Sequence, residues 1–319
     1  MTGRAGIRAV EPEGAVGSGA DNRPVVVFEY SQTGQLTEVA DALVAPLVAA
    51  GRPVRRVRYA PVEPYPFPWP VARFFGVFPA ATDESARVAL AADPAELYTA
   101  PDELVILAYQ VWYLAPSVPV RSLLAAHPEL FAGREVVTLV ACRNMWYSAA
   151  AEVRRTLAGL GARTVGTVAA IDTRPQGITL VTTLRWLLLG SRDGFLGRAG
   201  VGADELRRVG AAGERLAAAA GPDETALALA DAAPVVPVLA AADLVAGQVF
   251  RRAGAALRPA RGVARAAGLL GFALTLGVAI VTGLPALVAA RLLLGKRFDR
   301  VVRARLAGVT AATSAGAPR

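Results

Sequence analysis

Short apolar runs alternate with helical patterns along the chain from residue 24 onward. The first run, Val25–Tyr30, is rich in β-branched residues, and apolar positions then recur at helical spacing up to Gly51. Further strand-like runs occur at 54–59, 103–109, 135–140 and 164–169. The run at 54–59 is the most charged and suits a strand at the edge of the sheet. Helical patterns at 121–130 and 148–160 separate the later runs. This alternation over residues 24–170 predicts a parallel sheet with helices on both faces.

A segment rich in proline and aromatic residues, Pro61–Pro79, interrupts this alternation after the second strand. Proline removes backbone donors, so the segment predicts an ordered excursion that is neither a helix nor a central strand. Its aromatic side chains either plug into the flank of the sheet or form a lid or apolar wall beside a site. A helix at 83–92 is expected to return the chain to the sheet, whereas 171–245 predicts loops and helices.

A stretch of 25 residues without a charge, 266–290, lies between Arg265 and Arg291. At about 1.5 Å per residue a helix of this length reaches about 37 Å, enough for a hydrocarbon core of about 30 Å. Membrane association is one interpretation, and a buried helix or hairpin is the other, because glycines and Pro285 weaken a continuous helix. In a membrane the segment either spans it or forms an in-plane or re-entrant element bent at Gly283–Pro285.

Composition and charge narrow the classes of protein. Of the 319 residues, 54% are hydrophobic, which excludes an intrinsically disordered chain. The net charge of +8 is concentrated at the C-terminal end, where 246–319 holds 12 of the 34 basic residues and a single acid, Asp299. We therefore expect an anionic lipid surface as a partner and no nucleic acid. With one cysteine, Cys142, and one histidine, His127, no disulfide framework and no metal site are expected, and no catalytic residue stands out.

The turn after the first strand carries the most informative pattern. A strand leads into a loop that is rich in hydroxyl groups and contains one glycine, and a helix begins at once. Backbone N–H groups and the positive end of that helix suit a phosphate dianion without any lysine, whereas an ordinary helix cap is the simpler alternative. The predicted phosphate-binding residues are Ser31, Gln32, Thr33, Gly34, Gln35, Leu36 and Thr37.

Two further loops are expected to meet this turn at the carboxyl edge of the sheet. Each places a Trp-Tyr pair just after a strand, and the residues singled out are Gln110, Trp112 and Tyr113 in one loop and Cys142, Arg143, Asn144 and Trp146 in the other. Two aromatic loops beside a phosphate site predict FMN as the cofactor. The alternatives are core packing for both tryptophans, a small buried side chain for Cys142, and a surface ion pair for Arg143 instead of contact with the flavin or an acidic substrate.

The sequence resembles two groups of proteins at these residues. The strand, loop and helix at 30–37, with Trp112-Tyr113 and Asn144-Met145-Trp146, look like the flavodoxin-like fold. A closer resemblance, over about residues 24–210, is to bacterial dialkylresorcinol condensing enzymes. The segments that carry it are YSQTGQLTEVAD, YPFPWP, FFGVFP, LAYQVWYLAPSVPV and ACRNMW. The resemblance implies a doubly wound, five-stranded parallel sheet, an FMN site and a role in aryl lipid biosynthesis. One departure concerns the phosphate site, since flavodoxins usually carry threonine where this chain has Leu36.

These observations predict an FMN-dependent oxidoreductase that acts on a small lipophilic substrate, for example by aromatising a cyclic dione. Carbon–carbon condensation is disfavoured, because ketosynthases use a cysteine with two histidines or with a histidine and an asparagine. This chain has a single histidine. A membrane-bound electron carrier or quinone reductase, and a binding domain without cofactor, are the alternatives. The expected organisation is a disordered leader at 1–23, an FMN domain at 24–200, a helical extension at 201–245 and a basic membrane-associated segment at 246–319. The domain is expected to be cytoplasmic, attached to the inner face of the cell membrane, and the sequence leaves the oligomeric state open.

Overall fold

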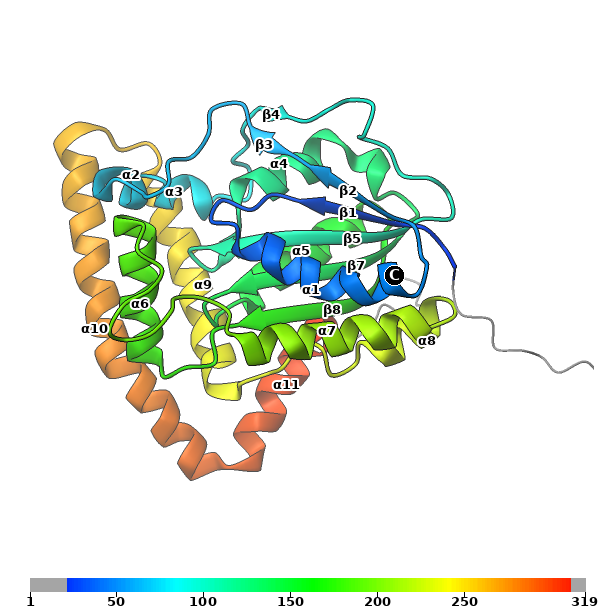
Figure 1. Cartoon of the computed structure of the whole chain (residues 1–319). Helices are drawn as coiled ribbons and strands as arrows, with labels where there is room; N and C mark the ends of the chain where they lie inside the picture. The colour runs from blue at the N-terminus through cyan, green and yellow to red at the C-terminus, as the bar shows by residue number, and fades with distance from the viewer. Residues whose placement is uncertain (1–21, 311–319) are drawn as a thin grey trace, which may run out of the picture.

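Five parallel strands form the centre of the molecule in a computed structural model that describes residues 22–310 (Figure 1). In space the strands follow the order β2-β1-β5-β7-β8, which is second, first, third, fourth and fifth along the chain. This is the order of a flavodoxin-like doubly wound sheet, so the predicted fold class is confirmed. Their bounds are Val25–Glu29 for β1, Val54–Arg58 for β2, Leu104–Trp112 for β5, Glu135–Cys142 for β7 and Arg163–Ile171 for β8.

The strands other than β2 are largely apolar because both faces of the sheet are covered. Every residue of β1 is buried, and its side chains divide between two clusters: Val26 and Phe28 belong to one, Val25 and Val27 to the other. β2 carries three arginines and forms one edge of the sheet, as its charge predicted. A continuous apolar run in a parallel strand therefore reports burial on two sides.

Helices α1 (Gln35–Ala49) and α7 (Ala203–Ala218) cover one face of the sheet, while α4 (Val118–Ala126) and α5 (Tyr147–Gly159) cover the other. α1 and α7 pack very closely, since a Cβ on Gly213 would clash with the carbonyl oxygen of Leu43. Although α7 falls in the predicted extension, its residues share a buried cluster with β1 and α1. α7 thus completes the α/β layer.

The segment between β2 and β5 differs from its prediction in two ways. The proline-rich excursion contains two short helices, α2 (Val71–Gly76) and α3 (Phe78–Ala81). Pro70 directly precedes α2 and Pro79 occupies the first turn of α3, where no backbone donor is needed. The helix expected at 83–92 does not form. Asp83 instead accepts hydrogen bonds from Ser85 in a tight turn, and the chain continues into β4 (Leu90–Ala91), which pairs with β3 (Ala60–Pro61).

β5 continues through Trp112, beyond its predicted end, and turns back into β6 (Ala115–Pro116). Trp112 pairs with Ala115, so only Tyr113 and Leu114 form the turn, with φ angles of 50° and 62°. Positive φ at both central residues is the geometry of a tight hairpin, for which Asn-Gly is the usual choice. Two bulky residues hold this strained geometry beside the predicted site.

The remaining helices lie mainly at the carboxyl edge of the sheet and below it, at the left and bottom of Figure 1. α10 is one continuous helix, so the chain neither reverses nor forms a hairpin at Gly283–Pro285. α9 packs against α5, α10 and α11. Of the predicted leader only residues 22 and 23 are described, and Arg23 pairs with Glu135. The helical bounds are Pro128–Leu130 for η1, Gln176–Leu189 for α6, Pro222–Ala228 for α8, Pro237–Leu257 for α9, Gly262–Leu294 for α10 and Lys296–Thr310 for α11.

Asp243 joins α9 to the start of α5. Its buried carboxylate accepts hydrogen bonds from the N–H groups of Tyr147 (2.9 Å) and Ser148 (3.0 Å). Burial raises the pKa of Asp243 to about 6, so at neutral pH the carboxylate form still accepts both bonds. This contact satisfies the first N–H groups of α5 from a distant part of the chain.

We expect Asp243→Ala to lower the free energy of unfolding by about 2 kcal/mol or more, because two buried N–H groups lose their acceptor. Urea unfolding at neutral pH measures the change, with Asp231→Ala on an exposed loop as the control. Equal stability of the two variants would contradict the capping role.

Candidate functional site

The three predicted loops lie at the same edge of the sheet. They follow β1, β5 and β7, which are neighbours in the sheet and run in parallel. Gln110 of β5 lies opposite Ala141 of β7, so the loop that begins at Cys142 starts beside the end of β5. Loops that are far apart in the sequence therefore lie at one edge of the sheet, as the strand order requires.

The β1–α1 turn offers a row of free backbone donors. Gly34, the N-cap residue of α1, is left-handed, with φ 81°, and has no side chain that could cap the helix. Ser31 accepts the N–H of Leu36 (3.2 Å) through its Oγ. Within residues 22–310, no acceptor lies against the N–H groups of Thr33, Gly34, Gln35 and Thr37. Such a row at the start of a helix suits an anion with several oxygens.

Three of the predicted phosphate-loop side chains have other contacts or positions. Gln32 donates to the carbonyl oxygen of Pro66 (2.9 Å) and so ties the turn to the aromatic segment. The side chain of Leu36 is fully buried in the core. Gln35 is also buried, and its Nε2 has no hydrogen-bond partner among the described residues. The turn can thus contribute backbone N–H groups and the hydroxyls of Ser31, Thr33 and Thr37.

Trp112 is surrounded by the chain's own aromatic rings. Its ring centroid lies 4.8 Å from that of Tyr65, 5.8 Å from that of Trp69 and 6.4 Å from that of Tyr30. All three contacts are edge-on, a favoured geometry for aromatic pairs. The excursion therefore packs its aromatic side chains against the β5 loop, one of the two interpretations that the sequence left open. Whether it also serves as a substrate wall stays a prediction.

Trp146 occupies a different place from the one predicted. Its side chain is fully buried in the cluster beneath α5 and stacks on Tyr147, with ring centroids 4.6 Å apart. Tyr147 in turn accepts the N–H of Val236 (3.0 Å). Because Trp146 directly precedes α5, it follows the inner face of that helix into the core. The expected pair of tryptophan rings around a ligand is therefore not formed in this structure.

Two buried amide oxygens at this edge have no hydrogen-bond donor among the described residues. They are Oε1 of Gln110, at the end of β5, and Oδ1 of Asn144, in the loop after β7. The Nδ2 of Asn144 donates to Gln176 (2.7 Å), so α6 orients the side chain. A buried acceptor without a donor is unfavourable unless a ligand or a water molecule satisfies it.

Arg143 and Cys142 precede Asn144 in the same loop. Partly buried Arg143 contacts Thr179 (3.4 Å), and no carboxylate of residues 22–310 lies within ion-pair distance of it, so the surface ion pair is not present. Burial raises the pKa of the Cys142 thiol to about 12. Cys142 is therefore a neutral thiol at physiological pH, and its side chain is half-buried.

Other titratable residues lie away from this edge or pair with each other. His127 ends α4, which runs back from the carboxyl edge, and its Nδ1 lies 3.1 Å from Glu129. Asp172, which follows β8, is buried and pairs with Arg174. No group of three or more histidine, cysteine, aspartate or glutamate residues able to hold a metal ion occurs in the described part of the chain.

Sequence reasoning missed two threonines that α6 contributes to the site. Thr179 and Thr182 are fully buried on this helix. Thr179 contacts Asn144 and Arg143, and Thr182 contacts Arg174. The spacing of two threonines three residues apart places them on one face of a helix, which could have indicated a polar contact surface.

Comparison with known proteins adds limited information. No family model and no curated protein matches the chain. Among solved structures, the chain is similar to a "putative flavoprotein" from Bacteroides eggerthii DSM 20697 (17% identity, TM-score 0.38, 52% of this chain and 98% of that chain covered). It is also similar to a "putative flavoprotein" from Bacteroides uniformis ATCC 8492 (14%, 0.35, 52% and 98%) and to two-electron reduced Megasphaera elsdenii flavodoxin (15%, 0.29, 48% and 89%). The fold assignment itself rests on the strand order.

Proposed function

We propose that the carboxyl edge of the sheet binds FMN and that the protein carries out a two-electron redox reaction on a lipophilic substrate. The observation that carries this proposal is the row of unpartnered N–H groups in the β1–α1 turn, next to loops with two unsatisfied buried amide oxygens. A phosphate dianion would accept hydrogen bonds from the N–H groups of the turn. A ring N–H, such as the one at the pyrimidine edge of a flavin, would donate to an amide oxygen.

The residues of the turn fit a phosphate despite the replacement at Leu36. Thr33, Gly34, Gln35 and Thr37 offer backbone N–H groups, and the hydroxyls of Ser31 and the two threonines add side-chain donors. α1 begins directly behind them, so its positive end faces the same point. The hydroxyl missing at position 36 is thus one donor among several.

A chain of aromatic contacts supports a lipophilic substrate. From Trp112 it continues through Trp69 to Phe74 (6.3 Å), and from Tyr113 through Phe78 to Phe272 on α10 (4.1 Å). Phe74 and Tyr113 lie 5.6 Å apart and join the two halves. Trp69 and Phe78 are buried, whereas Phe74 and Phe272 are half-buried, so an apolar substrate arriving along α10 would meet the accessible parts of these last two rings.

Arg143 supports an acidic substrate within this class. A cyclohexane-1,3-dione readily loses a proton, and the delocalised anion matches a partly buried guanidinium that has no carboxylate partner. Aromatisation of such a ring to a resorcinol removes one hydride equivalent and one proton, and bound FMN supplies the two-electron acceptor for this step. This reaction would give the protein a role in aryl lipid biosynthesis, in line with the sequence resemblance.

A binding domain without cofactor is the alternative that one observation favours. Trp146 is fully buried, and Trp112 already contacts three aromatic rings of the chain. Neither tryptophan therefore offers an open ring face of the kind that an electron carrier or quinone reductase would use to hold its flavin. Direct measurement of flavin binding separates these functions.

We also propose that α10 attaches the protein to a membrane with anionic lipids, on the cytoplasmic face. α10 is long and apolar enough to cross a bilayer, with a mean hydropathy of 2.1 in its most apolar window, of which none is buried. Both of its ends are held by the same body, however: Arg265 donates to Gly76 (2.7 Å), and α11 after it packs on α5 and α9. This arrangement supports a helix that lies along one leaflet.

Titration of the full-length protein with FMN tests the proposed function. We expect the purified chain to be yellow or to quench added FMN fluorescence, and to bind FMN more tightly than riboflavin, which lacks the phosphate. A colourless protein that binds neither compound would leave the cofactor-free alternative as the better description. Consumption of a cyclic dione under single-turnover conditions then tests the substrate.

A further inference from the structure

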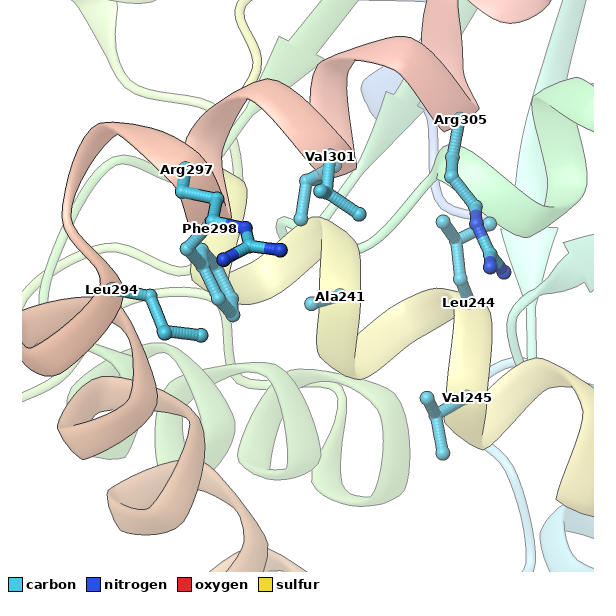
Figure 2. A pocket seen from close by; sticks show the side chains of 9 residues that line it. Ala241, Leu244, Val245, Leu294, Arg297, Phe298, Val301 and Arg305 are labelled. Atoms are coloured by element: carbon cyan, nitrogen blue, oxygen red, sulfur yellow. The ribbon is translucent and has the colours of Figure 1, made fainter.

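An open groove lies between α9, the end of α10 and α11. Its volume is about 570 Å³, and Figure 2 shows its lining. Leu244 and Val245 come from α9, while Phe298 and Val301 come from α11. None of the residues discussed for the flavin site contributes to it.

The floor of the groove is apolar and accessible. Val245 is 64% exposed, Val301 54% and Leu294, at the end of α10, 53%. Leu292 and Leu293 directly precede Leu294 and are even more exposed, so the groove continues the apolar surface of α10. An exposed apolar patch of this extent is typical of a contact with lipid or another macromolecule.

Two arginines of α11 line the groove, one toward each end in Figure 2. Arg297 and Arg305 lie eight residues apart, about 12 Å along the helix, and no carboxylate of the described residues pairs with either. The nearby acids are otherwise engaged, since Asp299 pairs with Arg291 and Asp243 caps α5. The groove therefore combines apolar contact surface with uncompensated positive charge.

We propose that this groove binds one anionic phospholipid of the membrane. The acyl chain would lie on Phe298, Val301 and Leu244, the guanidinium group of one arginine would pair with the phosphate, and the other would add positive charge at the opposite end of the groove. A phospholipid has acyl chains for the apolar lining and a negative charge for the two arginines. The groove also continues the exposed apolar end of α10, which would contact the same membrane. The proposal shares the membrane with the proposed function but does not depend on FMN.

Vesicle flotation with two matched double variants tests the groove. Arg297→Gln/Arg305→Gln removes two charges inside it, and Arg300→Gln/Arg303→Gln removes two exposed charges of the same helix that do not line it. Both pairs weaken diffuse attraction to anionic vesicles, at about 1 kcal/mol per charge. We expect the groove pair alone to lose a further tenfold or more in its preference for phosphatidylglycerol-containing over phosphatidylcholine vesicles.

A second measurement is needed because α10 alone could account for vesicle binding in the flotation experiment. Phospholipid that copurifies with the detergent-extracted chain is quantified by mass spectrometry for the wild type, both pairs and Val301→Trp, which fills the groove without a change in charge. Loss of phosphatidylglycerol in the groove pair and in Val301→Trp supports the site. Equal phosphatidylglycerol content in all four proteins overturns it, and so does an equal loss of preference in the two arginine pairs. Absence of vesicle binding by the wild type, with phosphatidylglycerol still retained, would refute the membrane attachment and keep the groove.

Discussion

Thr33→Glu is expected to weaken FMN binding by about 30- to 150-fold and to leave riboflavin binding within about threefold. Thr33 lies in the turn whose free N–H groups would surround the phosphate, and its side chain makes no hydrogen bond in the structure. A carboxylate about 4 Å from a phosphate costs about 4 kcal/mol per unit charge at an effective dielectric constant of 20, and partial exposure reduces this to roughly 2–3 kcal/mol. Only the phosphorylated ligand experiences this repulsion.

Thr33→Gln is the matched control, because it has the size of the glutamate variant without its charge. Fluorescence titration of both variants with FMN and with riboflavin gives the four affinities. If Thr33→Glu weakens the two ligands equally, the phosphate does not lie at this turn, and the assignment of residues 31–37 is wrong. If neither ligand binds the wild type, the flavin proposal itself fails.

Leu270→Glu/Leu274→Glu is expected to release the protein from membranes. Both leucines are more than 60% exposed on the outer face of α10 and lie one turn apart, so they would contact the acyl region together. Moving a charged side chain into that region costs about 2–3 kcal/mol, and two such residues reduce vesicle affinity about a thousandfold or more. Flotation of the full-length protein with anionic vesicles measures the change.

Ala45→Glu/Ala49→Glu on α1 is the control, since it adds two exposed charges at the same spacing on a helix that covers the sheet. Equal flotation of the two variants would show that α10 does not contact the membrane. Extraction with alkaline carbonate then distinguishes the modes of attachment. A helix along one leaflet is released by this treatment, whereas a spanning helix is retained.

Strand positions could be predicted because a strand covered on both sides must be apolar throughout. The runs at 25–30, 135–140 and 164–169 match β1, β7 and β8, and the charged run at 54–59 matches the edge strand β2. Local pattern was less informative where proline intervened. Prolines that seemed to exclude helices instead begin α2 and α3, and the helix expected at 83–92 gives way to a turn around Asp83 and a short strand.

The candidate site shows the same division between local and distant contributions. The free donors of the β1–α1 turn belong to one short segment, so glycine and hydroxyl residues at 31–37 were sufficient to indicate them. The place of Trp146 depends on the core that α5, α9 and α11 form together, and a tryptophan after a strand does not reveal which way its ring points. Likewise, the contact of Asn144 with Gln176 joins residues 32 apart.

The sequence by itself determined the parallel sheet, the anion-suited turn and the uncharged length of α10, because each follows from residues that are neighbours along one element. Only the tertiary structure decided that both ends of α10 are tied to one body, that Trp146 lies in the core, and that Arg297 and Arg305 line an apolar groove. These features depend on packing between helices distant in sequence. The packing of one helix on another decides which way a side chain points and which distant residues it contacts. The spacing of residues along a single element does not encode either.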